Sequence, residues 1–367
     1  MISGRALQQA LASAELGPCS GVPCSILGPL IRRLEASGSY TAAVDEGEAV
    51  GLAVGAALCG RTPVVLVQNS GLLNALNPLA TLALVYDIPL LMLVSHRGEP
   101  GTGDAPQHAV TGRITLPLLD LLGIEHEQLA ADEEALQSQI RRVRDGLLAS
   151  RVHALVARRG SIVDDDPGPP TVSDRPRRAE MLRLVVERAD RRSILVAATG
   201  KIARETHAVV QAIWGDDGPA LFPMAGSMGC AAAVGLGIAE QQPGQRVLVL
   251  DGDGAALMKL GSMATVACRR PPNLVHIVLD NEAYDSTGGQ PAASRQVALE
   301  QLARAAGYAS ARRVETPQQC ASALERLDGP GPHFVLAKVA PGADPDLPRL
   351  PRDLPALAAA FGRATGR

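Results

Sequence analysis

The sequence predicts an α/β protein made of two domains, each built around a parallel β-sheet that helices cover. Short apolar runs alternate with stretches of helical periodicity along the chain, which is typical of parallel strands joined by helices. The length of 367 residues corresponds to roughly two domains of about 150 residues each. Hydrophobic residues make up 46% of the chain but aromatic residues only 2%, so we expect cores built from Ala, Val, Leu and Ile.

In the first half, apolar runs predict strands at residues 64–67 and 90–94, and periodic stretches predict helices at residues 46–58 and 133–148. In the second half, the predicted strands are residues 194–197, 246–250, 274–279 and 334–339. The predicted helices of that half are residues 179–189, 228–240, 257–268 and 299–306.

A Pro- and Asp-rich segment without periodicity, residues 163–176, separates the two halves and is typical of an exposed linker. The domain boundaries follow from it: a first domain at residues 1–160, a linker at 161–178, a second domain at 179–345 and a C-terminal tail at 346–367.

Charge and hydropathy exclude several classes of protein. The formal net charge is −3 without a long basic run, so nucleic acid is not expected as a partner. The most apolar stretch, residues 82–94, contains Asp87 and Pro89 and is shorter than the roughly 20 residues of a membrane span. The first residues carry no apolar segment of a secretory signal, and we expect a cytoplasmic protein. The cysteines form neither a CxxC motif nor a His/Cys cluster, which favours a reducing compartment; they are Cys19, Cys24, Cys59, Cys230, Cys268 and Cys320.

Two predicted strands of the second half end in residues suited to a metal. Asp253 follows the apolar run 247–250 in an Asp-Gly-Asp-Gly turn, and Asn281 comes directly after strand 274–279 and Asp280. In open α/β sheets, ligands bind at the carboxyl ends of strands. A carboxylate and an amide oxygen are hard ligands that suit Mg²⁺, and the small residues 286–289 allow backbone N–H groups to approach a phosphate. A lone Asp-Gly-Asp-Gly is otherwise an ordinary turn.

In the first half, Glu46 begins a helix of small residues. Either it is functional, or it is an acid that the positive end of the helix dipole stabilises. Residues 49–53 of this helix resemble residues 233–237 of the second half. This similarity indicates either two related domains or a coincidence in a chain rich in Ala and Gly.

Together, these segments resemble the thiamine-diphosphate enzymes. The Gly-Asp-Gly to Asn segment is similar to that family's diphosphate–Mg²⁺ motif, and Glu46 stands nine residues before Gly55, where the family keeps its glutamate. Ser227-Met228-Gly229 resembles the loop whose large apolar side chain holds the cofactor bent.

Longer segments resemble the phosphonopyruvate decarboxylases: residues 21–25, 68–79, 97–101, 104–108 and 285–290, in a match from about residue 21 to about residue 339. The resemblance implies a pyrimidine-binding domain followed by a diphosphate-binding domain, with no central third domain. Those enzymes more often carry Gly at the position of Glu282 and His at that of Tyr284, so the role of Tyr284 stays open. Sulfopyruvate decarboxylase is a close relative.

The resemblance implies the cofactors thiamine diphosphate and Mg²⁺, with Glu46 as the catalytic carboxylate that hydrogen-bonds N1′ of the aminopyrimidine and favours its imino tautomer. The metal ligands would be Asp253, Asn281 and the backbone carbonyl of Ala283. The cofactor-binding residues would be Glu46, Gln68, Asn74, Met228, Asp253, Gly254, Ala255, Asn281, Ser286, Thr287 and Gly288. For Asn74 and Asn77, binding of the cofactor and capping of the following helix are both open.

The expected activity is decarboxylation of 3-phosphonopyruvate, a small-molecule 2-oxo acid, to phosphonoacetaldehyde and CO₂ in phosphonate and antibiotic biosynthesis. Ser25, Arg97 and His108 are the candidate substrate-binding residues, since an anionic substrate needs cationic or N–H-rich groups. Alternatively, Arg97 pairs with Glu99 at the surface and His108 is a loop histidine without a role in binding.

Two other functions stay open. One is decarboxylation of sulfopyruvate or another thiamine-diphosphate-dependent carboxy-lyase or carboligase reaction. The other is a non-catalytic cofactor-binding subunit, against which the presence of Glu46, Asp253 and Asn281 in one chain argues. In enzymes that this chain resembles, the two domains at one cofactor usually belong to different subunits. We therefore expect a homodimer or a higher homo-oligomer with active sites between subunits.

Overall fold

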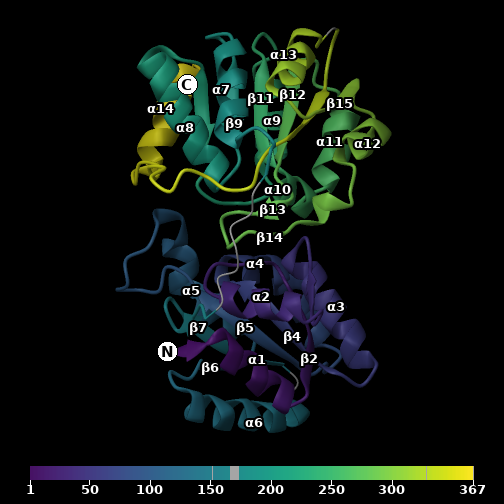
Figure 1. The fold of residues 1–367 in the computed structure, drawn as a ribbon, viewed down its shortest axis with the longest axis vertical. Helices are drawn as coiled ribbons and strands as arrows, with labels where there is room; N and C mark the ends of the chain where they lie inside the picture. Colours follow the sequence, from purple (N-terminus) through teal and green to yellow (C-terminus); the bar gives the residue numbers. More distant parts are fainter. Residues whose placement is uncertain (151, 166–172, 328, 367) are drawn as a thin grey trace. The chain divides into compact units, whose positions relative to one another are not determined.

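The computed structural model describes residues 1–150, 152–165, 173–327 and 329–366 and divides into two compact units, Met1–Pro169 and Pro170–Arg367 (Figure 1). Each unit contains a six-stranded parallel sheet flanked by helices, which confirms the predicted fold class. Residues 166–172 of the predicted linker lie outside the described residues.

The strands of the first unit's sheet follow the order β3-β2-β4-β5-β7-β6. Their bounds are β2 (Leu16–Gly21), β3 (Tyr40–Ala42), β4 (Thr62–Gln68), β5 (Leu90–His96), β6 (Glu125–Gln128) and β7 (Val152–Arg158). The helices are α1 (Gly4–Ser13), α2 (Gly28–Ala36), α3 (Glu46–Leu58), α4 (Asn69–Pro78), the π-helix η1 (Leu79–Ala83), the 3-10 helix η2 (Pro106–His108), α5 (Ala109–Leu121) and α6 (Glu133–Ser150). Two short strands, β1 (Ile2–Ser3) and β8 (Ile162–Val163), form a separate pair.

Both faces of the first sheet are covered by apolar helices. Leu66 and Leu93 belong to a core with α1, α2 and α6, whereas their neighbours Val65 and Met92 belong to a core with α3, α4 and α5. Side chains alternate between the two faces along a strand, so a strand covered on both faces needs an uninterrupted apolar run. This requirement explains why β4 and β5 were recognisable from the sequence.

The second unit's sheet follows the order β10-β9-β11-β12-β16-β15. Its strands are β9 (Ile194–Ala197), β10 (Ala220–Pro223), β11 (Val247–Gly252), β12 (Leu274–Asp280), β15 (Ser310–Val314) and β16 (His333–Lys338). Its helices are α7 (Arg178–Arg188), α8 (Lys201–Trp214), η3 (Gly215–Asp217), α9 (Ala231–Gln241), α10 (Asp253–Met258), α11 (Gly261–Arg269), η4 (Ala293–Arg295), α12 (Leu299–Ala306), α13 (Pro317–Glu325) and α14 (Leu354–Ala364). A short antiparallel pair, β13 (Ala283–Tyr284) and β14 (Gln290–Pro291), follows β12.

The two sheets share one strand order. Counted along the chain within each sheet, the order is 2-1-3-4-6-5 in both, with β2 to β7 in the first and β9, β10, β11, β12, β15 and β16 in the second. The similar stretches at residues 49–53 and 233–237 lie in α3 and α9, and each of these helices joins the second strand of its sheet to the third. This equivalent placement favours two related domains over coincidence.

The structure corrects several predicted elements. Residues 162–163, expected in the linker, form β8, in which Ile162 is buried. The helix predicted at 228–240 begins at Ala231, because Ser227 and Gly229 have positive φ angles of 58° and 88°. The helix predicted at 257–268 is two helices, α10 and α11, with Lys259 and Leu260 between them.

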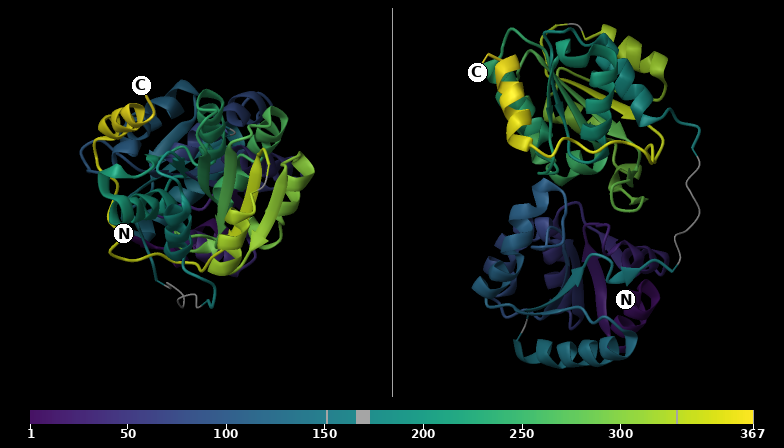
Figure 2. Two further views of the ribbon diagram at one scale, coloured as in Figure 1. Left: turned by 90° about the horizontal axis from the view of Figure 1, so that it is seen from above. Right: turned by 90° about the vertical axis from the view of Figure 1, so that its left-hand side faces the viewer.

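The C-terminal residues, expected as a tail, include α14, which appears in yellow along one side of the second unit in Figure 2. The ring of Phe361 on α14 lies 5.4 Å from the ring of Phe222 on β10. The cores are aliphatic as expected, because Phe334 is the one aromatic residue among the largest fully buried side chains of the described residues. All six cysteines are free thiols. No helix among the described residues has the length and apolar character needed to cross a membrane.

Candidate active site

Candidate residues of the first unit gather at the carboxyl edge of its sheet. Gly21, Gln68 and His96 end β2, β4 and β5, which are neighbours in the sheet. Because these strands are parallel, the loops that follow them start from the same edge. The segments at residues 21–25, 68–79 and 97–108 therefore lie near one another, as the sequence motifs require.

Glu46 is the first residue of α3, and its burial separates it from an ordinary solvated acid at a helix end. It is 5% exposed, and its Oε2 accepts a hydrogen bond of 2.8 Å from Nδ2 of Asn74. A Cβ atom on Gly71 would stand 2.0 Å from Oε1 of Glu46, so any larger residue there would displace this carboxylate. The N-cap function belongs to Asp45, which accepts a hydrogen bond from the backbone N–H of Gly47.

The two asparagines left open by the sequence have different environments. Asn74 lies within α4 and donates to Glu46, so it belongs to the carboxylate's surroundings rather than to a helix cap. Asn77 accepts from the Thr81 hydroxyl through its backbone carbonyl at 2.8 Å and its side-chain oxygen at 3.4 Å. This local contact links the end of α4 to η1, and binding of the cofactor by Asn77 stays a prediction.

Arg97 follows β5 and forms a bidentate ion pair with Asp104, with Nε and Nη2 donating at 2.6 and 2.7 Å. The backbone N–H groups of Gly98 and Ala105 donate to the same carboxylate. Hydrogen bonding to Arg97 holds the pKa of Asp104 well below its usual range. Glu99, which the sequence offered as a partner of Arg97, pairs instead with Arg158 at 2.5 Å.

His108 ends η2 beside this ion pair. Its Nδ1 is buried and has no hydrogen-bond partner among the described residues. Burial, followed by the nearby charge of Arg97, lowers the pKa of His108, which keeps the imidazole neutral at pH 7. A buried nitrogen without a partner costs about 1–3 kcal/mol, which a ligand at this site would offset.

The remaining candidates of the first unit lie at the same edge. Ser25 is exposed in the turn after β2, and Gln68 ends β4, where its Nε2 donates to the Ser70 hydroxyl at 2.6 Å. Sequence analysis missed Asn69, which is buried and bonds both the backbone N–H and the carbonyl of Arg97. It also missed Cys24, whose buried thiol lies 3.4 Å from the Ser95 hydroxyl. The available signal was their position after strands, with Asn69 directly after β4 and Cys24 three residues after β2, but Asn and Cys there have no distinctive pattern.

In the second unit, Asp253 lies at the carboxyl end of β11 as the first residue of α10, where the sequence predicted a sharp turn. It is 3% exposed, and its Oδ2 accepts a hydrogen bond of 2.5 Å from the Ser294 hydroxyl. Burial, followed by the nearby charge of Asp280, raises the pKa of Asp253 to about 7. A carboxylate in these surroundings favours a bound cation.

Asn281 directly follows β12, the neighbour of β11 in the sheet. Its Oδ1 accepts from the backbone N–H of Ala283 at 3.1 Å, and its Nδ2 donates to Asp285 at 2.6 Å. Tyr284, whose role the sequence left open, packs on α10, since a Cβ atom on Gly254 would stand 2.6 Å from its ring. The tyrosine therefore holds the Asn281 loop against the helix that carries Asp253.

Three further loops lie at this edge. Ser286, Thr287 and Gly288 lie between β13 and β14, and the Thr287 hydroxyl donates to the Tyr284 carbonyl. Ser286 approaches the β9–α8 loop, because a Cβ atom on Gly200 would stand 2.9 Å from its hydroxyl oxygen. Met228 is half-buried in the β10–α9 loop, which packs on α10: a Cβ atom on Gly229 would stand 3.2 Å from the carbonyl oxygen of Ala255. Sequence analysis missed the β9–α8 loop because it did not predict α8.

Both halves of the chain match models of one enzyme family. Residues 1–117 match the thiamine pyrophosphate enzyme N-terminal TPP binding domain, and residues 201–337 match the C-terminal TPP binding domain. A phosphonopyruvate decarboxylase from Streptomyces viridochromogenes is 36% identical, covering 99% of this chain and 95% of its own. A phosphonopyruvate decarboxylase from Streptomyces hygroscopicus is 35% identical, covering 94% and 89%. The chain belongs to the phosphonopyruvate decarboxylase family of thiamine pyrophosphate enzymes.

This family membership makes the chain a thiamine-diphosphate-dependent decarboxylase and confirms the resemblance seen in the sequence. It also argues against a non-catalytic cofactor-binding subunit. A sulfopyruvate decarboxylase from Methanosarcina acetivorans is more distantly similar, at 28% identity over 83% of each chain.

The donor set of this phosphonopyruvate decarboxylase homologue fits a Mg²⁺ ion held together with a diphosphate. The described residues contain no group of three or more His, Cys, Asp or Glu side chains that would form a complete metal site. Asp253 and Asn281 instead lie at the ends of the adjacent strands β11 and β12, and Ala283 follows two residues after Asn281. Mg²⁺ is typically bound by one or two protein oxygens plus phosphate oxygens and water, and this incomplete set suits that mode.

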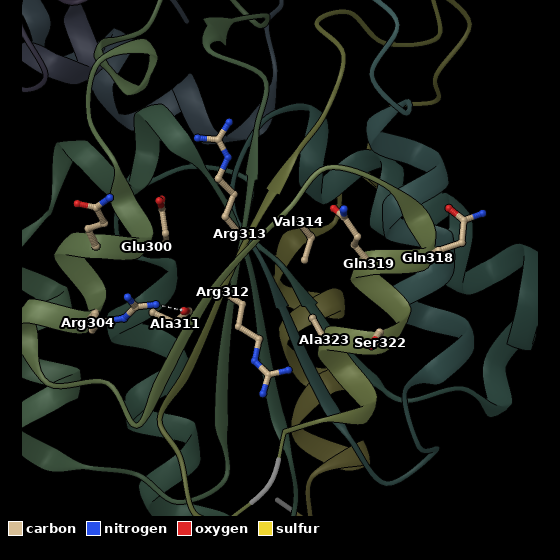
Figure 3. A pocket seen from close by; sticks show the side chains of 11 residues that line it. Glu300, Arg304, Ala311, Arg312, Arg313, Val314, Gln318, Gln319, Ser322 and Ala323 are labelled. Atoms are coloured by element: carbon tan, nitrogen blue, oxygen red, sulfur yellow. Dashed lines mark hydrogen bonds between the residues drawn. The ribbon is translucent and has the colours of Figure 1, made fainter.

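Two cavities of the decarboxylase's second unit contain none of the candidate residues. One, of about 690 Å³, lies along the edge strand β15 between α12 and α13. In Figure 3 the side chains of Arg312 and Arg313 leave this strand in opposite directions. The other, of about 580 Å³, is lined by residues at the amino ends of β9 and β11, opposite the edge that carries Asp253. Neither is a candidate for the cofactor.

Proposed function

We propose that this enzyme decarboxylates 3-phosphonopyruvate to phosphonoacetaldehyde and CO₂ in phosphonate biosynthesis, using thiamine diphosphate and Mg²⁺. The observation that carries the proposal is the similarity to two proteins named phosphonopyruvate decarboxylase, at 36% and 35% identity over nearly the whole chain. The named sulfopyruvate decarboxylase reaches 28% over 83% of each chain.

We assign the cofactor's two ends to the two groups of residues described above. Thiamine diphosphate, when bound, supplies a nucleophilic carbon. It also supplies a ring that accepts the electron pair of the bond between the keto carbon and the carboxylate group of the substrate. Glu46, supported by Asn74, would hold a proton at N1′ of the aminopyrimidine ring, and Met228 would support the bent conformation. Asp253, Asn281 and the Ala283 carbonyl would hold Mg²⁺. The residues proposed around the rest of the cofactor are Gln68, Gly254, Ala255, Ser286, Thr287 and Gly288.

The substrate's anionic groups would meet Ser25, Arg97 and His108. Asp104 occupies the Nε and Nη2 edge of Arg97, so a phosphonate would be bound through the remaining N–H groups of the guanidinium. This ion pair fixes the direction of the guanidinium before substrate arrives. His108 adds the unpaired Nδ1 described above.

A CO₂-release assay with purified protein tests the proposal. Phosphonopyruvate should be decarboxylated only when thiamine diphosphate and Mg²⁺ are both supplied. Sulfopyruvate, assayed side by side, is the second candidate because of the similarity to a sulfopyruvate decarboxylase. Faster turnover of sulfopyruvate or of another 2-oxo acid would assign the enzyme to that substrate instead.

We further propose that the enzyme is cytoplasmic and acts as a homodimer or higher homo-oligomer whose active sites combine residues of two chains. The division of the proposed residues supports this, since Glu46 belongs to the first unit and Asp253 to the second.

A further inference from the structure

The side-chain amide of Asn281 has a defined orientation because both of its partners select it. Nδ2 donates to Oδ2 of Asp285 at 2.6 Å, and Oδ1 accepts from the backbone N–H of Ala283 at 3.1 Å. A carboxylate only accepts hydrogen bonds and a backbone N–H only donates, so a flipped amide would lose both contacts. Oδ1 keeps a second lone pair for another partner.

Asp285 is itself held by two further groups, the nearly buried guanidinium of Arg178 and the backbone N–H of the exposed Gly342. Its Oδ2 also accepts from Nη1 of Arg178 at 2.8 Å, and its Oδ1 accepts from the backbone N–H of Gly342 at 3.0 Å. The side chains of Arg178 and Asp285 are 4% and 9% exposed. Glu205 holds the other edge of Arg178 with bonds of 2.7 and 3.1 Å. The carboxylate of Asp285 therefore cannot turn away from Asn281 without breaking buried bonds.

We propose that Asp285, anchored by Arg178, is a positioning residue that fixes the amide of Asn281 with its oxygen available to the metal ion. This inference rests on the proposed function, because it takes Asn281 as a ligand of Mg²⁺. Without Asp285, the amide loses the partner that distinguishes its nitrogen from its oxygen, and a fraction of molecules would present the nitrogen, which cannot bind Mg²⁺. Groups that orient a metal ligand in this way commonly contribute about ten- to hundredfold to metal affinity.

Calorimetric titration of the full-length protein with Mg²⁺ at a fixed concentration of thiamine diphosphate tests the proposal. Asp285→Leu, which has nearly the same size but no hydrogen-bond acceptor, should weaken Mg²⁺ binding by about ten- to hundredfold. Glu205→Gln is the matched control: it alters the same buried cluster, but its amide oxygen still accepts from Arg178 and it does not touch Asn281. Its effect should stay below about threefold. An equal loss in both variants would mean that the cluster acts through stability alone and would overturn the proposal.

A double-mutant cycle identifies the residue through which Asp285 acts. Asn281→Ser replaces the amide by a hydroxyl oxygen that needs no partner to distinguish two ends. In that background, adding Asp285→Leu should cause little further loss of Mg²⁺ affinity. A full additional loss would show that Asp285 does not act through Asn281. Thermal unfolding of each apoprotein checks that the variants fold, and if Asp285→Leu fails to fold, Asp285→Ala in the same cycle replaces it.

The wild-type protein separates failure of this inference from failure of the proposed function. If its cofactor binding does not depend on Mg²⁺, the metal assignment is wrong and the inference is wrong with it. If cofactor binding depends on Mg²⁺ and Asp285→Leu does not weaken Mg²⁺ binding, the inference alone is wrong.

Discussion

The carboxylate of Glu46 lies almost out of water at the start of α3, with Asn74 as a hydrogen-bond donor and Gly71 beneath it. The Asp104 carboxylate is different, because Arg97 and two backbone N–H groups surround it. We propose that the Glu46 carboxylate acts on the bound cofactor, whereas the Asp104 carboxylate fixes the guanidinium of Arg97. The sequence alone did not distinguish these roles, since each residue appears there as a single acid in a loop or at a helix start.

Glu46→Gln should still bind thiamine diphosphate but lose turnover by about a hundredfold or more. The amide keeps nearly the same shape and can still accept from Asn74, yet it cannot stabilise a proton at the aminopyrimidine nitrogen. Calorimetry measures cofactor affinity, and hydrogen–deuterium exchange at C2 of the bound thiazolium measures the proton-transfer step. Normal exchange in the variant would show that Glu46 has only a structural role.

Asp104→Asn should destabilise the protein by about 1–2 kcal/mol at neutral pH, because it removes a charged partner of Arg97. The pKa of Asp104 lies below its ordinary value of 3.8 in the folded protein. Its charge therefore stabilises the fold above pH 3.8, and this contribution is lost as the pH falls below that value. Denaturant unfolding of both proteins should show a stability difference that shrinks below pH 3.8. The exposed Asp216 offers a control, Asp216→Asn, for which little difference is expected at any pH.

At the scale of helices and strands, the elements recovered from the sequence are those with strong apolar periodicity. The predicted bounds of α3, β9 and α12 coincide with those of the structure. The strand β2 was missed because Gly17, Pro18 and Ser20 interrupt its apolar pattern. The division between α10 and α11 was also invisible, since Lys259 and Leu260 are ordinary helical residues and tertiary packing ends α10 there.

The carboxyl edge of the second sheet was recognisable because Asp253 and Asn281 each end a clear strand. The contacts that orient Asp253 and Asn281 could not be recognised, because Arg178 and Asp285 are 107 residues apart in the sequence. Ser294 likewise reaches Asp253 from a separate 3-10 helix, η4. Such contacts form only in the folded chain, and no local sequence pattern predicts them.

The loop between β10 and α9 carries an element-scale prediction. Gly229 has a φ of 88°, and a Cβ atom there would stand 2.6 Å from Cγ of Lys259. Gly229→Ala should therefore strain the loop by about 1–3 kcal/mol, displace the neighbouring Met228 and weaken thiamine diphosphate binding by about tenfold. Gly237→Ala, in α9, is the matched control, because nothing lies within 4 Å of its added methyl group. Equal cofactor affinity in both variants would contradict the assignment of Met228.

At the scale of the whole molecule, the shared strand order makes positions in the two units equivalent. Gln68 ends the third strand of the first sheet, and Asp253 directly follows the third strand of the second, whereas Arg97 and Asn281 directly follow the fourth strands. The carboxyl edge of the sheet therefore carries a substrate-binding candidate in the first unit and a metal-binding candidate in the second. This equivalence is consistent with the match of the two halves to the N-terminal and C-terminal TPP binding domains of one enzyme family.

The last prediction concerns assembly. The active enzyme should be at least a dimer in which the first unit of one chain and the second unit of another form each active site. Glu46→Gln removes the proposed function of the first unit, and Asp253→Ala removes the metal ligand of the second, so each variant should be inactive alone. Refolded together, they form mixed dimers in which an intact first unit from one chain meets an intact second unit from the other. One of the two sites is then complete, and about half of the wild-type activity per mixed dimer should return.

Native mass spectrometry confirms that mixed dimers have formed, and each variant refolded alone is the control. Mixed dimers without activity would mean that each site is made within a single chain.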